Sequence, residues 1–383
     1  MRILFCGLSG IPNKASASIN RYMAIGQALS ENNEIIYINR FPLFRSTETR
    51  SAEPDSFRII DATNTIFRPD KFLKRNLLKL TSFIFEFNKI KKLHKEKKID
   101  WLNIYTQYFG IFLVYYSFSK LLKFKTVLHY VEFRSSFKDR NFLFKINDWL
   151  FDNVAIYLCD KIIPISTILN NYVLSLKPRA KTLIIPPICD FKYFASIEPE
   201  ITDQKYFVFC SSITYEEVIL FVINSFLQMK TKKVALHLVI NGKIENDEIN
   251  QLLENNKDRI HLFSNLKYET LIAKYKGALA ELIPLRNTMQ DCARFPQKIC
   301  EFLASNRPLI TTSYGEINNY FTDKTNAIIS PEFEVKSFSA QLDWAIEHQN
   351  ELKSISEQSY ITGNKHFDIK SYSLKLDDFL RTF

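Results

Sequence analysis

Cations and a carboxylate lie close together in residues 294–317, RFPQKICEFLASNRPLITTSYGEI. Lys298, Glu301 and Ser305 follow one another at intervals of three and four residues, so a helix would present them on one side. A helix N-terminus beside Arg294 and Lys298 suits a diphosphate, because free N–H groups and the helix dipole favour negative charge. Glu301, one turn further on, could accept hydrogen bonds from both hydroxyls of a ribose. These residue types therefore suit a nucleotide diphosphate.

The same spacing has a second interpretation, which involves no ligand. A solvated surface helix would also place Lys298 and Glu301 as an i, i+3 ion pair, which stabilises a helix by only about 0.2–0.5 kcal/mol. The spacing alone leaves both interpretations open.

Local signals predict the elements that hold these side chains. Pro296 suits the first helical position, where its missing N–H is not needed. Asn306 can adopt the left-handed conformation that ends a helix, and Pro308 then prevents its continuation. The apolar, β-branched run PLITT is typical of a strand in a covered sheet. We therefore expect a loop, a short helix, a buried strand and a turn.

This segment also resembles a known one. The pattern P-Q-K-x-x-E-F-L-A-S-N-R-P-L-I-T-T is similar to the donor-binding segment of retaining GT-B glycosyltransferases of family 4 (group 1), typically P-x-K-x-x-E-Y-x-A-x-G-x-P-V-I-A. The resemblance implies that Lys298 lies by the donor pyrophosphate and that Glu301 holds the ribose. Gly315 and Glu316 match the Gly-Glu that often follows the strand. It further implies a nucleotide diphosphate sugar as donor, retention of configuration, and neither a metal nor a cofactor.

A histidine ends another predicted strand, in the segment VLHYVEF. The carboxyl ends of parallel strands are where open α/β sheets bind ligands, although a lone histidine there is often structural. The family has a histidine at this position, usually followed by Asp, that contacts the donor sugar. The resemblance thus assigns His129 to catalysis, with Tyr130 replacing the Asp and Glu132 as a nearby carboxylate.

A glycine-bearing loop opens the chain after the strand RILFC, and a helix near residues 16–30 follows it. This is the opening unit of a nucleotide-binding α/β fold, but the pattern is not G-x-G-x-x-G, so a dinucleotide is not indicated. By resemblance, Gly7, Ser9 and Gly10 lie near the substrates and Ser211 lies on the donor side.

Some positions depart from the family pattern. After the first strand of the second half the family has an Arg and a Lys-Gly that hold the diphosphate, whereas CSSITYEEVILF has Glu216 and Glu217. The family carboxylate eight residues before Glu301 falls on Ala293, and neither Asp190 nor Asp291 clearly replaces it. Positive charge would have to come from Arg286, Arg294 and Lys298. An alternative is therefore a catalytically degenerate protein that acts as a binding or scaffold subunit.

Strands alternate with helices in both halves of the 383 residues, which indicates two doubly wound, largely parallel sheets in an α/β protein. With the resemblance, we expect a GT-B fold of two Rossmann-like domains facing a cleft. The expected domains are 1–195 on the acceptor side and 196–363 on the donor side. A C-terminal helix, 364–383, is expected to cross back to the first domain.

Positive charge is concentrated in the first domain. The net charge of the chain is +10, whereas residues 1–195 alone carry about +14. This concentration of positive charge implies an anionic partner. Residues 71–98 predict a basic amphipathic helix, because apolar residues recur there at helical spacing between lysines. Those residues are Phe72, Leu73, Leu77, Leu80, Phe83, Ile84, Phe87 and Ile90. Such a helix either packs on the sheet or contacts an anionic membrane surface. No nucleic-acid motif is found, so nucleic acid is not an expected partner.

Other features bear on location. MRILFCGLSG does not resemble a signal peptide, and residues 104–122 predict a strand end and a buried helix rather than a membrane span. Six single cysteines without C-x-x-C indicate reduced thiols. We expect a cytoplasmic enzyme, peripheral on the inner membrane face. Its acceptor would be a glycan or lipid-linked glycan, in cell-surface polysaccharide synthesis.

Overall fold

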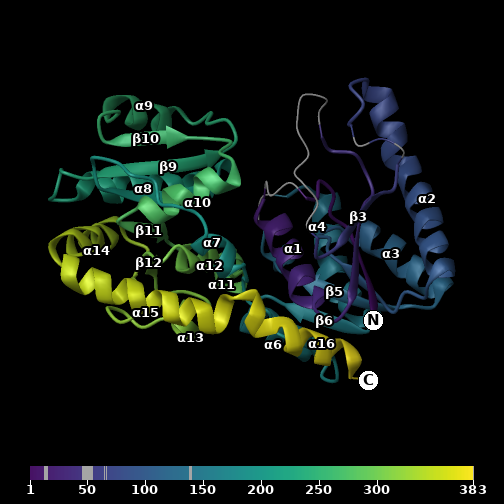
Figure 1. Ribbon diagram of the computed structural model, residues 1–383. Coiled ribbons are helices and arrows are strands. Elements are labelled where there is room, and N and C mark those ends of the chain that lie inside the picture. Colours follow the sequence, from purple (N-terminus) through teal and green to yellow (C-terminus); the bar gives the residue numbers. More distant parts are fainter. Residues whose placement is uncertain (13–15, 45–54, 64, 66, 138–139, 383) are drawn as a thin grey trace. The chain divides into compact units, whose positions relative to one another are not determined.

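The computed structural model describes residues 1–12, 16–44, 55–63, 65, 67–137 and 140–382. It contains two compact units (Figure 1). Unit 1 comprises Met1–Ile188 and Ile369–Phe383, and unit 2 comprises Cys189–Asp368. Each unit is a parallel sheet flanked by helices, which is the predicted α/β architecture.

Unit 1 has a seven-stranded sheet in the order β3-β2-β1-β4-β5-β6-β7, with every adjacent pair parallel. Its strands are β1 (Arg2–Cys6), β2 (Glu34–Asn39), β3 (Arg58–Asp61), β4 (Trp101–Ile104), β5 (Lys125–Tyr130), β6 (Lys161–Pro164) and β7 (Lys181–Thr182). Its helices are α1 (Ala17–Ser30), α2 (Phe72–Glu96), α3 (Phe109–Leu122), α4 (Phe142–Leu150), α5 (Ile156–Leu158), α6 (Thr167–Leu176) and α16 (Ser373–Arg381). The central strand β1 is buried along its whole length, as expected for a strand covered on both faces.

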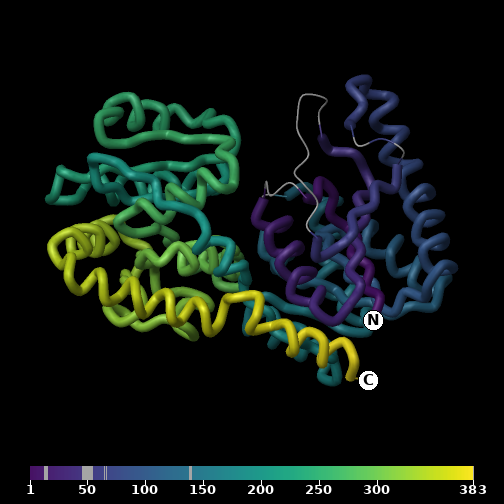
Figure 2. Tube along the Cα trace, in the orientation of Figure 1, coloured from purple at the N-terminus to yellow at the C-terminus, as the bar shows by residue number. Residues whose placement is uncertain are grey.

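The last segment of the chain packs against the first helix of unit 1 (Figure 2). The Nδ2 of Asn33, just after α1, donates to Oδ1 of Asp377 in α16 at 2.9 Å. Lys161, in β6, donates to the carbonyl of Thr382 at 2.6 Å and so bonds the C-terminal end of α16, where a cation is favoured by the helix dipole.

Unit 2 has a six-stranded parallel sheet in the order β10-β9-β8-β11-β12-β13. Its strands are β8 (Tyr206–Ser212), β9 (Ala235–Asn241), β10 (Ile260–Phe263), β11 (Ala280–Ile283), β12 (Leu309–Thr312) and β13 (Ile328–Ser330). Its helices are α7 (Phe191–Ala195), α8 (Glu216–Gln228), α9 (Asp247–Asn255), α10 (Tyr268–Gly277), α11 (Met289–Ala293), α12 (Lys298–Ala304), α13 (Ile317–Tyr320), α14 (Val335–Glu347) and α15 (Gln349–Phe367).

The chain order fixes where each sheet can bind a ligand. In unit 2 the chain builds β8, β9 and β10 outward and then returns to place β11 on the other side of β8. Loops at the carboxyl ends of β8 and β11 therefore diverge, and such a switch point is the usual ligand position in open α/β sheets. The corresponding point of unit 1 lies between β1 and β4.

The apolar stretch at 104–122 forms the end of β4 and then α3, as predicted. Within the described residues, every helix is too short or too polar to cross a bilayer.

Candidate functional site

The segment 294–312 forms the predicted loop, helix and strand, but Pro296 precedes the helix and does not occupy its first position as expected. After a loop, α12 runs from Lys298 to Ala304, and Asn306 ends it with a φ of 57°, in the left-handed region. The strand β12 then follows with all its residues buried. The helix begins two residues after Pro296, whose carbonyl accepts a bond from the N–H of Ile299 at 3.1 Å. One of the N–H groups expected to bind a diphosphate is therefore already bonded.

Lys298 lies half-buried at the switch point of unit 2. Burial raises the pKa of the Cys210 thiol in β8, and the positive charge of Lys298 opposes that rise, so the two groups are close. In the part of the chain that the structure describes, no carboxylate lies within ion-pair distance of the Lys298 ammonium. Its charge is thus not neutralised by a neighbouring acid.

Glu301 is not a surface partner of Lys298, so the solvated-pair interpretation is wrong. The side chain is 3% exposed, and its Oε1 accepts a hydrogen bond at 3.0 Å from the hydroxyl of Tyr268 in α10. Ser305, on the same side of α12, is also buried and donates at 2.7 Å to Glu281 in β11. The polar side of α12 therefore faces the interior of unit 2.

Two arginines expected to supply positive charge share one buried carboxylate. Asp291, in α11, is fully buried and accepts from Arg286 Nε at 2.8 Å and from Arg294 Nη2 at 2.9 Å. Burial alone would raise the pKa of Asp291, but the hydrogen bond from Arg286 and the charge of Arg294 hold it below its usual value. The bond to Asp291 likewise raises the pKa of Arg286.

The same arginines reach the loop after β8, where the family places its own cations. The guanidinium of Arg294 lies 4.3 Å from the ring centre of Tyr215. Arg286 Nη1 pairs with Glu217 Oε2 at 2.6 Å. Two arginines against two carboxylates leave no net charge in this cluster. Among the three expected cations, Lys298 alone is without a carboxylate partner in the described structure.

The turn after β12 is closely packed. Gly315 has a φ of 61°, and a Cβ there would lie 2.9 Å from the carbonyl oxygen of Cys292. Glu316 is buried and accepts from Asn319 Nδ2 at 3.1 Å. At the end of β8, the Ser211 hydroxyl donates to the carbonyl of its neighbour at 3.2 Å. The side chains of Glu316 and Ser211 thus bond within the protein, and Gly315 packs against the backbone of Cys292.

In unit 1, the loop after β1 is held against the end of β4. Gly7 has a φ of 109°, and a Cβ there would lie 2.2 Å from the carbonyl oxygen of Tyr105. The N–H of Gly10 donates to Asn39 Oδ1 at 3.0 Å. The Ser9 hydroxyl accepts from the N–H of Phe41 at 3.4 Å. This loop accordingly takes a single, well-packed course.

His129 lies near the end of β5, 1% exposed, with its ring stacked on Tyr105 at 5.6 Å between centroids. Its Nε2 is 3.1 Å from Oδ1 of Asn103 in β4. Burial, with a contribution from the charge of Arg21, lowers the pKa of His129 to about 3. The ring is thus neutral near pH 7. Its Nδ1 is buried without a hydrogen-bond partner among the described residues.

Glu132, three residues further on, belongs to a polar cluster. Its Oε2 accepts from Gln107 Nε2 at 2.9 Å and from Arg134 Nη1 at 3.1 Å. Arg134 is almost fully buried and also pairs with Asp148 of α4 at 3.4 Å. Glu132 therefore serves as a counterion of Arg134 in this structure.

The structure brings some of the predicted residues together and adds others. Lys298 and Glu301 share α12, and Gly7 and His129 both pack on Tyr105. Sequence reasoning missed the acceptor role of Asp291 for both arginines, although the i, i+3 spacing to Arg294 was a signal for one of them. It also missed Tyr268, which reaches Glu301 from a distant part of the chain, and Arg134, which lies only two residues from its partner Glu132.

A comparison with models of protein families finds a match in unit 2. Residues 192–362 match the model described as glycosyl transferases group 1. This match covers less than half of the chain, so it relates unit 2, and not the whole chain, to that family. A comparison with curated proteins returned no match.

Solved structures resemble the whole chain, not only residues 192–362. Sucrose-phosphate synthase from Thermosynechococcus elongatus is 13% identical with a TM-score of 0.76, covering 99% of this chain and 98% of that one. HepE of Anabaena, solved with UDP and glucose, is 14% identical with a TM-score of 0.70 over 100% of both chains. WaaG, a glycosyltransferase involved in lipopolysaccharide biosynthesis, is 12% identical with a TM-score of 0.66 over 100% of both. The GT-B fold predicted from the sequence is thus confirmed.

Proposed function

We propose that this protein transfers a sugar from a nucleotide diphosphate sugar to a hydroxyl of a glycan or lipid-linked glycan, with retention of configuration. The observation that carries the proposal is the position of Lys298. An unneutralised, half-buried ammonium lies at the switch point of unit 2, the part of the chain that matches the group 1 family, where a diphosphate would need a cation. The HepE structure with UDP and glucose is consistent with this class of donor.

Each candidate residue has a role in the proposal. Lys298 and Arg294 stabilise the charge that develops on the leaving diphosphate, without a metal ion. Glu301, whose Oε1 accepts from Tyr268, binds the ribose. The donor side is completed by Ser211, Gly315 and Glu316.

His129 orients the donor sugar in this proposal. Because the ring is neutral, Nδ1 is able to accept a hydrogen bond from a sugar hydroxyl while Nε2 donates to Asn103. The acceptor side is assigned to Gly7, Ser9, Gly10 and Glu132. Catalysis then rests on positioning and electrostatics, with the leaving diphosphate helping to deprotonate the incoming hydroxyl.

A panel of nucleotide sugars tests the proposal. The purified chain is incubated with each donor and candidate acceptors, released nucleotide diphosphate is measured, and NMR reads the anomeric configuration of the product. We expect turnover with one donor class and a retained configuration. Lys298→Met should lower kcat/KM about 10²–10³-fold, as removal of one charge-stabilising donor does elsewhere. Lys257→Met, an exposed lysine of unit 2, is the matched control.

A second candidate function is a scaffold or binding subunit on the same fold. It is favoured by the neutralised arginines and by Ala293 at the family's carboxylate position. An absence of turnover with every donor, together with no nucleotide binding at millimolar concentration, would favour the scaffold and remove the transferase proposal.

We also propose a cytoplasmic location and a role in cell-surface polysaccharide synthesis. All six cysteines are free thiols, which suits a reducing compartment. Fractionation of cells that express the tagged chain tests the location, and recovery outside the cytoplasm and its membrane face would contradict it.

A further inference from the structure

Helix α4 is oriented opposite to most amphipathic surface helices, because it exposes its apolar side to solvent. Two of its three polar residues point inward: Asp148 is buried and pairs with Arg140 at 2.8 Å, and Asn147 accepts from the N–H of Phe109 at 2.9 Å. Its large apolar residues are exposed to solvent instead. They are Phe142 (75%), Leu143 (76%), Ile146 (41%) and Trp149 (56%). A helix that exposes its apolar side needs something to cover it.

Helix α2 has a second exposed apolar stripe. Leu73, Leu77, Leu80 and Ile84 follow one another at intervals of three and four residues, and each is more than 60% exposed. The helix is held to unit 1 through its C-terminal half, where Ile90 and Leu93 are buried. Of the two alternatives left open by the sequence, packing on the sheet does not hold for this stripe, because the buried side is another side of the helix.

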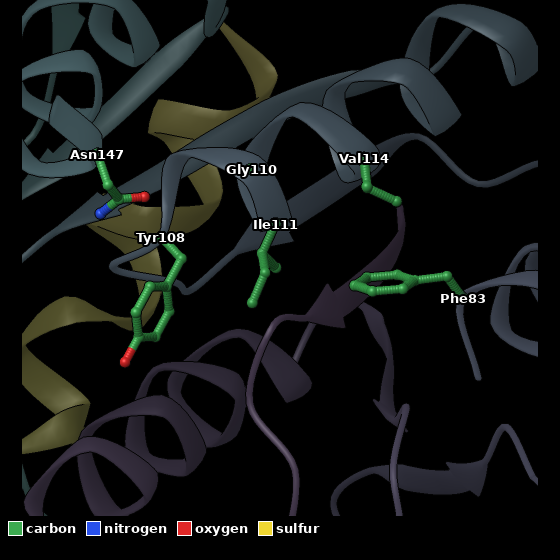
Figure 3. A pocket seen from close by; sticks show the side chains of 6 residues that line it. All are labelled: Phe83, Tyr108, Gly110, Ile111, Val114 and Asn147. Atoms are coloured by element: carbon green, nitrogen blue, oxygen red, sulfur yellow. The ribbon is translucent and has the colours of Figure 1, made fainter. Parts of the chain in front are cut away.

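A shallow apolar hollow lies over α3 and is also lined by residues of α2 and α4 (Figure 3). It has a volume of about 400 Å³ and takes side chains from all three elements. Those residues are Phe83 of α2, Tyr108, Gly110, Ile111 and Val114 at and within α3, and Asn147 of α4. The exposed stripes of α2 and α4, together with this hollow, are called the apolar face of unit 1 below.

The exposed charged residues of the two helices that carry the apolar face are mainly basic. Helix α2 has only two acidic residues, the buried Glu86 and the exposed Glu96. Its basic residues are Lys74, Arg75, Lys79, Lys89, Lys91, Lys92 and Lys95. Helix α4 contributes Lys145, which is exposed.

This charge decides between two kinds of occupant. A second copy of the chain, docked by the same surface, would bring like charges together, which is unfavourable. An anionic lipid leaflet supplies the complementary charge, while its hydrocarbon boundary accepts exposed leucine and phenylalanine side chains. A tryptophan such as Trp149 favours the same membrane–water boundary.

We propose that the apolar face of unit 1 docks on an anionic membrane surface, with α4 and the N-terminal half of α2 inserted at the level of the lipid headgroups. This goes beyond the proposed transfer reaction and does not depend on it. Docking needs neither a nucleotide sugar nor an acceptor.

Vesicle binding tests the proposal on the full chain. Co-sedimentation is measured with vesicles of phosphatidylcholine alone and of phosphatidylcholine with about one quarter phosphatidylglycerol. We expect binding to the anionic vesicles to be at least about tenfold stronger and to weaken with salt. Equal binding to both vesicles, or to neither, would overturn the proposal.

Paired substitutions locate the contact. Leu77→Ser with Leu80→Ser on α2, and Phe142→Ser with Leu143→Ser on α4, should each weaken binding by about tenfold or more, since each pair removes two inserted side chains. The replaced residues are exposed, so circular dichroism should stay unchanged. The matched controls are Ile201→Ser and Leu374→Ser, which are exposed apolar residues outside the apolar face. Variants that bind as wild type would refute the assignment of this surface.

Tryptophan fluorescence gives an independent readout. Trp101 is buried and Trp344 stacks on His348 in unit 2, so Trp149 is the tryptophan placed to report insertion. We expect a blue shift with anionic vesicles that Trp149→Phe abolishes. A concentration-dependent shift without vesicles, accompanied by dimers in analytical ultracentrifugation, would instead show a second copy as the occupant and overturn the membrane assignment.

Discussion

Two buried ionisable groups of unit 1 should give its stability opposite dependences on pH. Burial lowers the pKa of His129 to about 3 from 6.5, whereas burial raises the pKa of Glu86 to about 8 from 4.5. Glu86 accepts from the Tyr115 hydroxyl at 3.1 Å and is fully buried between α2 and α3. Both groups are therefore neutral in the folded state at pH 7, because His129 has lost its proton and Glu86 has kept its own.

The signs follow from proton linkage. Between pH 3 and 6.5 the unfolded chain binds a proton at His129 that the folded state does not, so this residue makes stability rise with pH. Between pH 4.5 and 8 the folded state keeps a proton at Glu86 that the unfolded chain has lost, so this residue makes stability fall with pH. At about 1.4 kcal/mol per pH unit, His129 contributes a gain of about 2 kcal/mol from pH 5 to 8, and Glu86 a loss of about 3–4 kcal/mol.

Single substitutions separate the two effects. Urea unfolding of wild type, His129→Gln and Glu86→Gln is measured from pH 5 to 8, in a Trp344→Phe background so that Trp101 and Trp149 report on unit 1. The difference between wild type and His129→Gln should rise by about 2 kcal/mol over this range. The difference between wild type and Glu86→Gln should fall by about 3–4 kcal/mol. Glu96→Gln, at an exposed site on the same helix, is the matched control.

The shape of the difference profiles is decisive. Parallel curves for wild type and His129→Gln would mean that His129 titrates alike in the folded and the unfolded state. That result would contradict its role as a neutral, orienting ring. The proposed role also requires that activity show no inflection from His129 between pH 5 and 8.

Further predictions concern the switch point of unit 2. Gly315→Ala should lower the free energy of unfolding by about 2 kcal/mol, because the residue has a positive φ and its Cβ would meet backbone at 2.9 Å. Gly110→Ala, where a Cβ meets no atom within 4 Å, is the matched control, and equal effects in urea unfolding would contradict the assignment. Asp291→Asn should destabilise unit 2 by about 3 kcal/mol, because two arginines lose their shared counterion. Nucleotide affinity, measured by calorimetry, should not fall in this variant, since the freed arginines add positive charge; a fall would refute the neutralisation argument.

The local structure of the site could be predicted because its signals are local. Pro296, Asn306 and the run PLITT predict the loop, helix and strand on their own, and Asn306 does take the left-handed conformation. The alternation of strands and helices likewise predicts two parallel sheets, as observed. The partners of the site residues are different, because Tyr268 and Glu281 reach α12 only through the tertiary fold.

Amphipathic spacing showed a similar limit on α2. The period of Leu73, Leu77, Leu80 and Ile84 predicts a helix with an apolar side, and a helix forms there. The period does not say which side faces the sheet, because that depends on what the rest of the chain offers for packing. In α4 and α2 the protein buries other sides of the helices and leaves apolar ones exposed.

Calorimetric titration with UDP and GDP tests the central claim, that Lys298 neutralises a nucleotide diphosphate. Wild type and Lys257→Met should bind one of the two nucleotides saturably. Lys298→Met should bind it about 10–150-fold more weakly, which corresponds to one charge-assisted hydrogen bond of about 1.5–3 kcal/mol. Lys298→Arg should retain part of the affinity. Wild-type affinity in Lys298→Met, or no binding of either nucleotide by wild type at millimolar concentration, would contradict the account.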